Sequence, residues 1–511
     1  MAIKISGTTV INDSRNITDV ENFGNSDTVY TGNGANITGI EAGSSSFTAS
    51  GSVANGRAVL LNANGTVSVP TTSVRSTPFL GSVHNIVSLT SGYIRAVYDS
   101  NSDKVVIINR DGGSGPGDAL VATVSGTDIT FGNNVEWTSN AVSSYQATFD
   151  SSNNKVVIVY SDQGQSFYLK AIVGTVSGDS ISFGTPTTII SASTYRYDVT
   201  FDSNSNKVVV AYNNEGNSRG EAVVGTVSGT SISFGSATTF ESSATQHLGA
   251  TFDSNSNKVV VAYLDSGNSN RGTAAVGTVS GTSISFGTPV VYNFNTTYYS
   301  EATFDSNSNK VVIVYTDVGS SYDGEAVVGT VSGTSISFGT PVVFETPNNV
   351  NNPDVVFDSV NNRIIVAYED DGNGGAGTVI IGTVSGTSIS FGTKVVYDRN
   401  NQGNSPTPIF LNKRGLIVYL DDTNNIGKAL VIDNQATTMT ASNFVGIAAE
   451  AISSGASGSV TIAGGINSSQ SGLSVARKYY VQGDGTLDTA AGVPSIEAGI
   501  SISATKINVG A

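Results

Sequence analysis

Few side chains in this sequence are suited to catalysis. It contains no Cys and only two His, His84 and His247, which lie in different parts of the chain. Two separate His residues are too few for a metal site with several His ligands and disfavour a Ser-His-Asp relay, and without Cys there is no thiol nucleophile. Enzyme chemistry would fall to the 40 Asp and Glu residues. A glycosidase needs two carboxylates a few ångströms apart, but the sequence shows no unique pair, so we expect no enzyme, no catalytic residue and no cofactor.

Oxygen-bearing side chains recur at alternate positions in one short segment, as at Asp253, Asn255 and Asn257. A calcium loop of the EF type has such a pattern, but it continues with Gly at the sixth position and Glu at the twelfth. Here the sixth position holds Lys258, whose charge repels a metal cation. We therefore interpret these segments as hairpin turns with Asx-type hydrogen bonds, and we expect no metal site.

Aromatic side chains gather in the connections that vary most between copies of a sequence repeat, such as ESSATQHLGATF and YNFNTTYYSEATF. Amphipathic rings in such connections could stack on sugar rings or pack at an interface. The candidate ligand- or host-binding residues are Trp137, Tyr145, Tyr195, Tyr197, His247, Tyr292, Tyr298 and Tyr299. The alternative interpretation, that scattered loop tyrosines simply cover the surface, stays open.

The repeat that carries these residues has seven copies, spaced 51 to 53 residues apart. Its phrases are FDSNSNKVVVAY and GTVSGTSISFG. One copy contains four short runs rich in Val, Ile, Phe and Tyr, at 250–252, 258–263, 274–279 and 283–291, separated by turn residues. Four strands in one repeat are typical of a β-propeller blade, and several blades can close into a ring that leaves only short edges.

Ring closure is predicted from the last copy, residues 405–434, which lacks the SISFG phrase of the fourth strand. A segment resembling a fourth strand, residues 78–87, precedes the first copy instead. We predict an all-β chain with a seven-bladed β-propeller over residues 78–434, four strands per blade, closed by this N-terminal strand.

The segments on either side of such a ring would emerge side by side. Residues 46–77 and 435–511 contain further short strand patterns around Gly-rich turns. We predict that they form one small, discontinuous β-barrel or sandwich domain into which the propeller is inserted. Residues 1–45 are polar and too short to hold a core, and we expect an N-terminal anchoring arm ordered by other subunits.

Composition and charge exclude several partners. The chain carries 24 basic and 40 acidic residues, a net charge of −16, and so lacks the clustered Lys and Arg that bind nucleic acid or anionic lipid. No stretch has the roughly 18 apolar residues of a membrane span, and the start, MAIKISGTTV, lacks the apolar core of a signal peptide. We expect no nucleic-acid partner, no membrane partner and no general secretory export.

Phrases at both ends of the chain resemble virion structural proteins of tailed bacteriophages, particularly those of marine bacteria and cyanobacteria. They are ISGTTVINDSRNITDV, FVGIAAEAISSGASGSVTIAGG and YYVQGDGTL, together with the repeats. The flanking barrel is similar to the β-domain of phage capsid decoration and fibre proteins. The resemblance implies a non-enzymatic tail-fibre or head-decoration component, assembled in the host cytoplasm and located in the virion.

In this interpretation the arm and barrel contact other capsid or tail proteins, and the propeller touches a glycan or protein of the host surface. We expect a homo-oligomer, most simply a trimer, because such assemblies are symmetric. Two alternatives remain. One is a bacterial surface adhesin, which the missing export signal disfavours. The other is a propeller glycoside hydrolase or depolymerase that acts on envelope polysaccharide.

Overall fold

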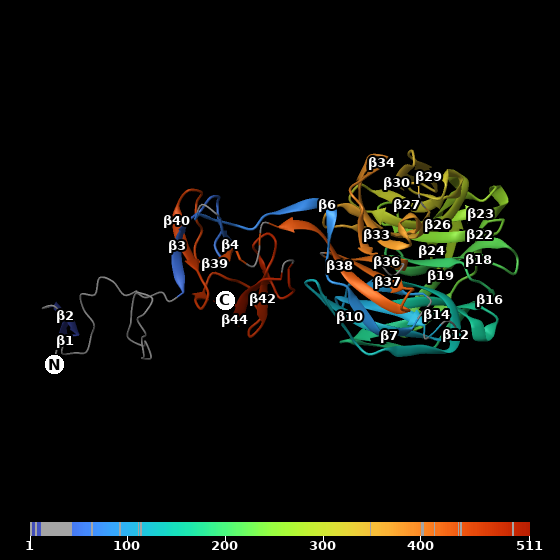
Figure 1. Cartoon of the computed structure of the whole chain (residues 1–511). Helices are drawn as coiled ribbons and strands as arrows, with labels where there is room; N and C mark the ends of the chain where they lie inside the picture. The colour runs from blue at the N-terminus through green and yellow to red at the C-terminus, as the bar shows by residue number, and fades with distance from the viewer. Residues whose placement is uncertain are drawn as a thin grey trace.

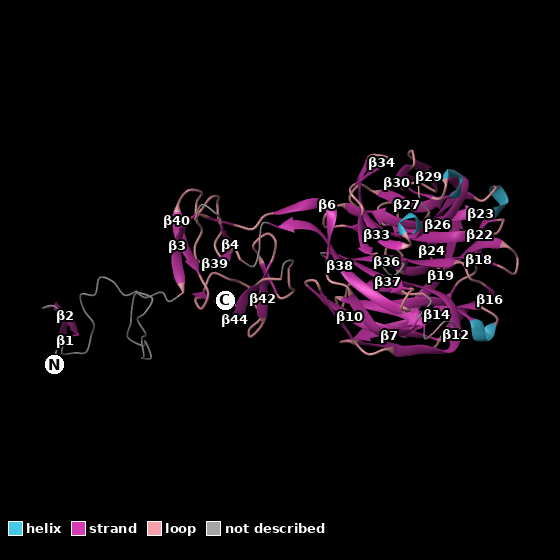
Figure 2. Ribbon diagram, viewed as in Figure 1, coloured by secondary structure: helices cyan, strands magenta, loops and turns pink. Residues whose placement is uncertain are grey.

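The structure is a computed structural model that describes residues 3–5, 8–11 and 43–510, apart from gaps at 63–64, 91–92, 111, 113–114, 348, 400–402, 413, 438, 440–441 and 493–494. Besides four three-residue 3-10 helices, every regular element in this part is a β-strand (Figure 2), which confirms the all-β prediction. The 3-10 helices are η1 (Gln163–Gln165), η2 (Ser266–Asn268), η3 (Val318–Ser320) and η4 (Asp371–Asn373).

The predicted N-terminal arm falls mostly outside the described residues. Within it, β1 (Ile3–Ile5) and β2 (Thr8–Ile11) form an antiparallel pair. No helix in the part of the chain that the structure describes is long and apolar enough to cross a membrane.

Each repeat copy folds into an antiparallel sheet, here called a module. In the third copy the strands are β17 (Tyr197–Asp202), β18 (Lys207–Asn214), β19 (Arg219–Ser228), β20 (Ser231–Phe234) and β21 (Thr238–Glu241). They follow the order β17-β18-β19-β20, and β21 also pairs with β19, so the expected fourth strand is split into two segments. The middle strand β18 is buried along almost its whole length, which explains its uninterrupted Val-rich sequence.

The turn between the first two strands is held by its aspartate, as predicted. The Asp202 Oδ1 atom accepts hydrogen bonds from the backbone N–H groups of Asn204 and Ser205, at 2.9 and 3.0 Å. Its Oδ2 atom accepts a bond from the Ser205 hydroxyl at 2.6 Å. The same pattern of backbone donors recurs at Asp253 and Asp305. The carboxylate therefore closes the hairpin, which confirms the interpretation as an Asx-type turn.

The other copies repeat this arrangement. The first two share a long strand, β12, and comprise β8 (Arg95–Asp99), β9 (Lys104–Arg110), β10 (Pro116–Ser125), β11 (Asp128–Phe131), β12 (Val135–Asp150), β13 (Lys155–Asp162), β14 (Tyr168–Ser177), β15 (Ser180–Phe183) and β16 (Thr187–Ser193). The fourth and fifth share β26 and comprise β22 (Thr245–Asp253), β23 (Lys258–Asp265), β24 (Arg271–Ser280), β25 (Ser283–Phe286), β26 (Val290–Asp305), β27 (Lys310–Asp317), β28 (Asp323–Ser332), β29 (Ser335–Phe338) and β30 (Val342–Glu345). The sixth comprises β31 (Val350–Asp358), β32 (Arg363–Asp370), β33 (Ala376–Ser385), β34 (Ser388–Phe391) and β35 (Val395–Asp398).

The last copy takes its outer strands from the N-terminal side of the repeats. Its own strands are β36 (Gly403–Leu411), β37 (Arg414–Asp421) and β38 (Ile426–Thr437), and β38 pairs with β6 (Thr72–Leu80) and β7 (His84–Thr90). Ile432 lies opposite Leu80, and the Gly81 N–H donates to the Val431 carbonyl at 2.8 Å. Strands from the two ends of the array thus share one sheet.

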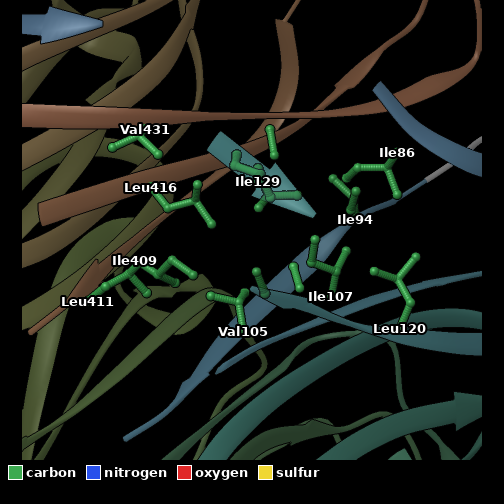
Figure 3. Packing of buried hydrophobic residues seen from close by; sticks show 14 of the residues in the cluster. Ile86, Ile94, Val105, Ile107, Leu120, Ile129, Ile409, Leu411, Leu416 and Val431 are labelled. Atoms are coloured by element: carbon green, nitrogen blue, oxygen red, sulfur yellow. The ribbon is translucent and has the colours of Figure 1, made fainter. Parts of the chain in front are cut away.

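Apolar clusters join each module to the next. One cluster connects the first copy with the last, where Ile107 and Leu120 pack with Leu416 and Val431, and Ile86 of β7 completes it (Figure 3). Other clusters join the first copy to the second and the sixth to the last. The modules therefore pack face to face around a closed array, and this part of the chain is a β-propeller.

The Tyr that recurs at the end of the second strand has a structural role. Tyr315 is fully buried, and its hydroxyl donates to Glu325 Oε2 at 2.7 Å. Tyr368 is likewise buried, and its ring lies 5.3 Å from that of Phe344, which comes from the preceding module. Phe344 in turn covers Gly324, where any added Cβ would lie 2.4 Å from the ring. An aromatic ring, a buried Tyr and a Gly therefore form one packing unit between modules.

Two further sheets flank the array (Figure 1). One has the order β3 (Ser44–Thr48), β40 (Ser457–Thr461), β39 (Phe444–Ala448), β4 (Ala58–Leu61), β5 (Val67–Ser68). The other has the order β41 (Ile466–Asn467), β45 (Lys506–Val509), β44 (Glu497–Ser503), β42 (Lys478–Val481), β43 (Leu487–Asp488). Leu60 packs with Ile447, Val481 and Ile507 in one cluster, so chain segments from both sides of the repeats share a core.

Candidate functional site

Four of the eight predicted binding residues lie in the core. Trp137, Tyr145, Tyr197 and Tyr292 are between 3% and 6% exposed. Trp137 packs 4.7 Å from Tyr160, and the Tyr197 hydroxyl donates to the Ser144 carbonyl at 2.5 Å. A ligand-facing role is therefore wrong for these four, because their rings fill the space between modules.

The other four predicted residues reach the surface. Tyr195 is 42% exposed and its ring lies 4.8 Å from that of Phe167. His247, Tyr298 and Tyr299 are partly buried and belong to two neighbouring modules. The His247 ring lies 4.9 Å from each tyrosine ring, and the two tyrosine rings are 6.2 Å apart. The structure thus brings three of the predicted residues together and leaves Tyr195 apart from them.

His247 and Tyr299 each lie at a register shift near the start of the first strand of their module. The register of β22 against β23 shifts between Gln246 and Gly249, and β26 shifts against β27 in the same way. Inside the shift, His247 and Tyr299 have φ values of 50° and 52°. Non-glycine residues rarely adopt this left-handed conformation, which is costly and is concentrated at functional sites.

The same conformation recurs in the next two modules, at Asn352 (φ 45°) and Ser405 (φ 48°). We call His247, Tyr299, Asn352 and Ser405 the mouth cluster. Together with Arg95, Glu301 and Asp354 they line a cavity of about 80 Å³. The repeated bulge therefore turns four different side chains toward one space.

A second cavity, of about 160 Å³, shares Arg95, Glu301 and Asp354 with the first. Six modules each contribute one polar residue from their first strand to its lining, and this set is here called the channel ring. Its members are Arg95, Gln146, Asp198, Glu301, Asp354 and Thr407. The remaining module has Gly249 at the corresponding position of the repeat. The first strands of the modules thus enclose a polar channel below the mouth cluster.

Burial shifts the acid–base behaviour of the channel ring. It raises the pKa of Asp198 to about 7, although backbone N–H bonds from Ala250 and Val199 oppose the rise. Burial likewise raises the pKa of Asp354 to about 6 and that of Glu301 well above its ordinary value, where the neighbouring Asp198 adds to the effect. The channel carboxyls are therefore protonated at higher pH than ordinary carboxyls.

Arg95 supplies the counter-charge in this ring. Its Nε–H donates to Gln146 Oε1 at 3.0 Å, and its Nη1–H donates to the Ile94 carbonyl at 3.1 Å. One guanidinium thus faces three carboxyls. Among the described residues no group of three or more His, Cys, Asp or Glu side chains is placed to hold a metal ion.

Further exposed aromatics were not predicted. Phe294 is 71% exposed with the Arg271 guanidinium 5.4 Å from its ring centre, and Tyr322 is 39% exposed. Tyr93 is 43% exposed, with the Arg110 guanidinium 5.7 Å from its ring. The channel ring was also missed. Its signal was available, since this repeat position changes from Arg to Gln, Asp, Gly, Glu and Thr while the next residue is Ala or Val in six of the seven copies.

Comparison with known proteins gives no family. No protein-family model and no curated protein matches the chain. Among solved structures, one described as the Dos1 propeller is similar over 70% of this chain and 95% of its own, with a TM-score of 0.42 and 9% identity. AofleA from Arthrobotrys oligospora is similar over 68% of this chain and 96% of its own, with a TM-score of 0.39 and 9% identity.

Proposed function

We propose that the chain is a display protein in which a seven-bladed propeller, residues 78–434, is inserted into a small sandwich built from 46–77 and 435–511. The pairing of β38 with β6 and β7 supports a closed ring. The core shared by Leu60, Ile447 and Ile507 supports a single flanking domain from both chain ends. In such a design the sandwich is the attachment module and the propeller is the presented module.

The proposed role is structural and non-enzymatic, in the virion of a tailed phage. It rests on the resemblance of the terminal phrases and the repeats to virion proteins. The sandwich and the N-terminal segment would attach to other capsid or tail proteins in a symmetric oligomer, most simply a trimer. The propeller would then face the host as part of a tail fibre or a head decoration.

The proposed binding site is the mouth cluster together with the adjacent Tyr298, and its ligand is a glycan of the host surface. The observation that carries this proposal is the close grouping of His247, Tyr298 and Tyr299 beside a polar cavity. A sugar ring has an apolar face, which stacks on aromatic rings, and a rim of hydroxyl groups. Asn352 and Glu301 line the same cavity and offer an amide and a carboxyl to those hydroxyls.

The binding proposal is tested by measuring purified protein against an array of bacterial envelope glycans. Tyr298→Ala and His247→Asn are the test variants, since Asn tolerates the left-handed backbone at position 247. Phe294→Ser is the matched control, because this exposed ring lies outside the three-ring group. We expect about tenfold weaker binding or more in each test variant and unchanged binding in the control. Equal binding by all four proteins, or no binding to any glycan, contradicts the proposal.

The virion role needs a separate test. Negative-stain microscopy of purified virions with an antibody fragment against residues 78–434 is expected to label the tail fibres or the head surface. Label at fibre tips supports host recognition, and label over the head supports decoration. Virions that bind no antibody fragment would contradict the proposed virion role and favour the alternative of a bacterial surface adhesin.

One observation favours a second candidate function, hydrolysis of envelope polysaccharide. A general acid needs a carboxyl with a raised pKa, and burial gives Asp198, Glu301 and Asp354 such pKa values. The test is release of reducing ends from the bound polysaccharide, with Glu301→Gln as the variant. Release by the wild-type protein that is lost in this variant would establish the hydrolase, and absence of release in both removes it.

A further inference from the structure

The channel ring places groups of opposite charge on facing strands at the centre of the propeller. Arg95 comes from β8, Asp198 from β17, Glu301 from β26 and Asp354 from β31. The remaining strands around the cavity contribute neutral groups, Gln146 from β12 and Thr407 from β36, and β22 contributes no side chain at Gly249. The carboxyls thus face one cation and one another across about 160 Å³ of space.

Each acidic member of the ring is tied to the strands that carry the mouth cluster. The Asp198 Oδ2 atom accepts a hydrogen bond from the Ala250 N–H at 2.7 Å, so β17 is fastened to β22 of the next module. Glu301 follows Tyr299 by two positions, and Asp354 follows Asn352 by two positions. Repulsion between the carboxylates therefore acts directly on the bulged segments at the mouth.

We propose that the channel ring is a proton-operated latch, in which protonated carboxyls of Asp198, Glu301 and Asp354 keep the first strands closed, and their ionisation loosens the ring and the mouth cluster. Ionised, the three groups carry three negative charges against the single charge of Arg95. Protonated, they are neutral hydrogen-bond donors and acceptors in a polar cavity. The latch concerns the ring itself and does not depend on the ligand proposed above.

The direction of the pH dependence follows from linkage. Ordinary aspartates in an unfolded chain ionise near pH 4, whereas the folded pKa of Asp198 is about 7 and that of Asp354 about 6. The folded state therefore binds more protons across this window. Stability contributed by these groups is complete below about pH 4 and is lost as the pH rises through 6 and 7.

Other titratable groups near the mouth have to be separated from the latch. Burial and the nearby Arg196 lower the pKa of His247 to about 4, so its contribution to stability has the opposite sign and is lost as the pH falls. Burial, together with Asp371 and Asp422, raises the pKa of Glu369 to about 7, which adds to the same trend as the latch. Comparing each channel variant with the wild-type protein cancels both contributions, because His247 and Glu369 are the same in the two proteins.

The test is the pH dependence of unfolding of the full chain, measured by urea titration from pH 4.5 to 8.5 without ligand. Each channel carboxyl is expected to raise the unfolding constant by up to about tenfold per pH unit between its unfolded and folded pKa values. Asp198→Asn and Asp354→Asn should each lose that part of the dependence. Asp128→Asn, at the exposed start of β11 and outside the channel lining, should match the wild-type protein.

Hydrogen exchange at the Ala250 amide provides a second measurement. We expect its protection to fall in the wild-type protein above pH 7, after correction for intrinsic exchange, and to fall less in Asp198→Asn, where only Glu301 and Asp354 still ionise. Wild-type stability that is independent of pH, or Asn variants that keep the wild-type slope, overturns the latch. So does failure of both Asn variants to fold at pH 5, because an amide has the shape and neutrality of the protonated carboxyl.

Discussion

The packing of an aromatic ring on a glycine between modules gives a quantitative prediction for Gly324→Ala. The new Cβ would lie 2.4 and 2.6 Å from two atoms of the Phe344 ring. That ring is held by Tyr368 at 5.3 Å and by Phe391 at 5.6 Å, and so cannot move aside freely. Overpacking of this kind costs about 1–3 kcal/mol, and the lower entropy of unfolded Ala returns about 0.4–1 kcal/mol.

We therefore expect Gly324→Ala to lower the free energy of unfolding by about 1–2 kcal/mol in urea titration. Gly216→Ala is the control, because its closest contact, at 3.1 Å, is the end of the Asn214 side chain. Combining Gly324→Ala with Phe344→Leu should relieve the clash, so the double variant loses less stability than the two single variants together. A neutral Gly324→Ala, or strict additivity in the double variant, would refute the packing argument.

Three further predictions concern the loss of hydrogen bonds. Tyr315→Phe leaves Glu325 without its 2.7 Å donor, and a loss of about 1–3 kcal/mol is expected in thermal or urea unfolding. Gly81→Pro removes the N–H that donates to Val431. Hydrogen exchange in β38 should therefore become faster than in the wild-type protein, while exchange in β27 is unchanged. If the substitution changes exchange in both strands equally, the closing role of β6 is contradicted. Asp305→Ala removes the acceptor of two backbone N–H groups in its turn, with an expected loss of about 1 kcal/mol; no loss would mean that water replaces the carboxylate.

The repeat explains why much of the fold could be predicted from the sequence. Copies of one phrase fix the strand order, and the turn aspartates recur because each carboxylate closes its own hairpin, as at Asp202. The absence of SISFG after residue 434 indicated that the last module takes a strand from elsewhere, and β6 and β7 provide it. What the phrases did not show is that the fourth strand is split in two, because both halves pair with the same neighbour.

The candidate site was predicted less well, for a physical reason. Variable connections were taken to be surface loops, but Trp137 and Tyr292 belong to outer-strand segments whose rings turn inward between modules. His247 and Tyr299 reach the mouth through a left-handed bulge, and no residue preference in the sequence marks that conformation. The channel ring depends on contacts between modules about 50 to 300 residues apart, which appear only when the repeats close into an array.

Hydrogen–deuterium exchange with and without a binding glycan shows directly whether ligand binds at the mouth of the propeller. We expect protection in the segments 245–249, 297–301 and 350–354, which carry the bulged strand starts. The turns at 253–258 and 305–310 lie at the opposite ends of β22 and β26 and should exchange unchanged. Protection confined to those turns, or to the flanking sheets, would contradict the claim.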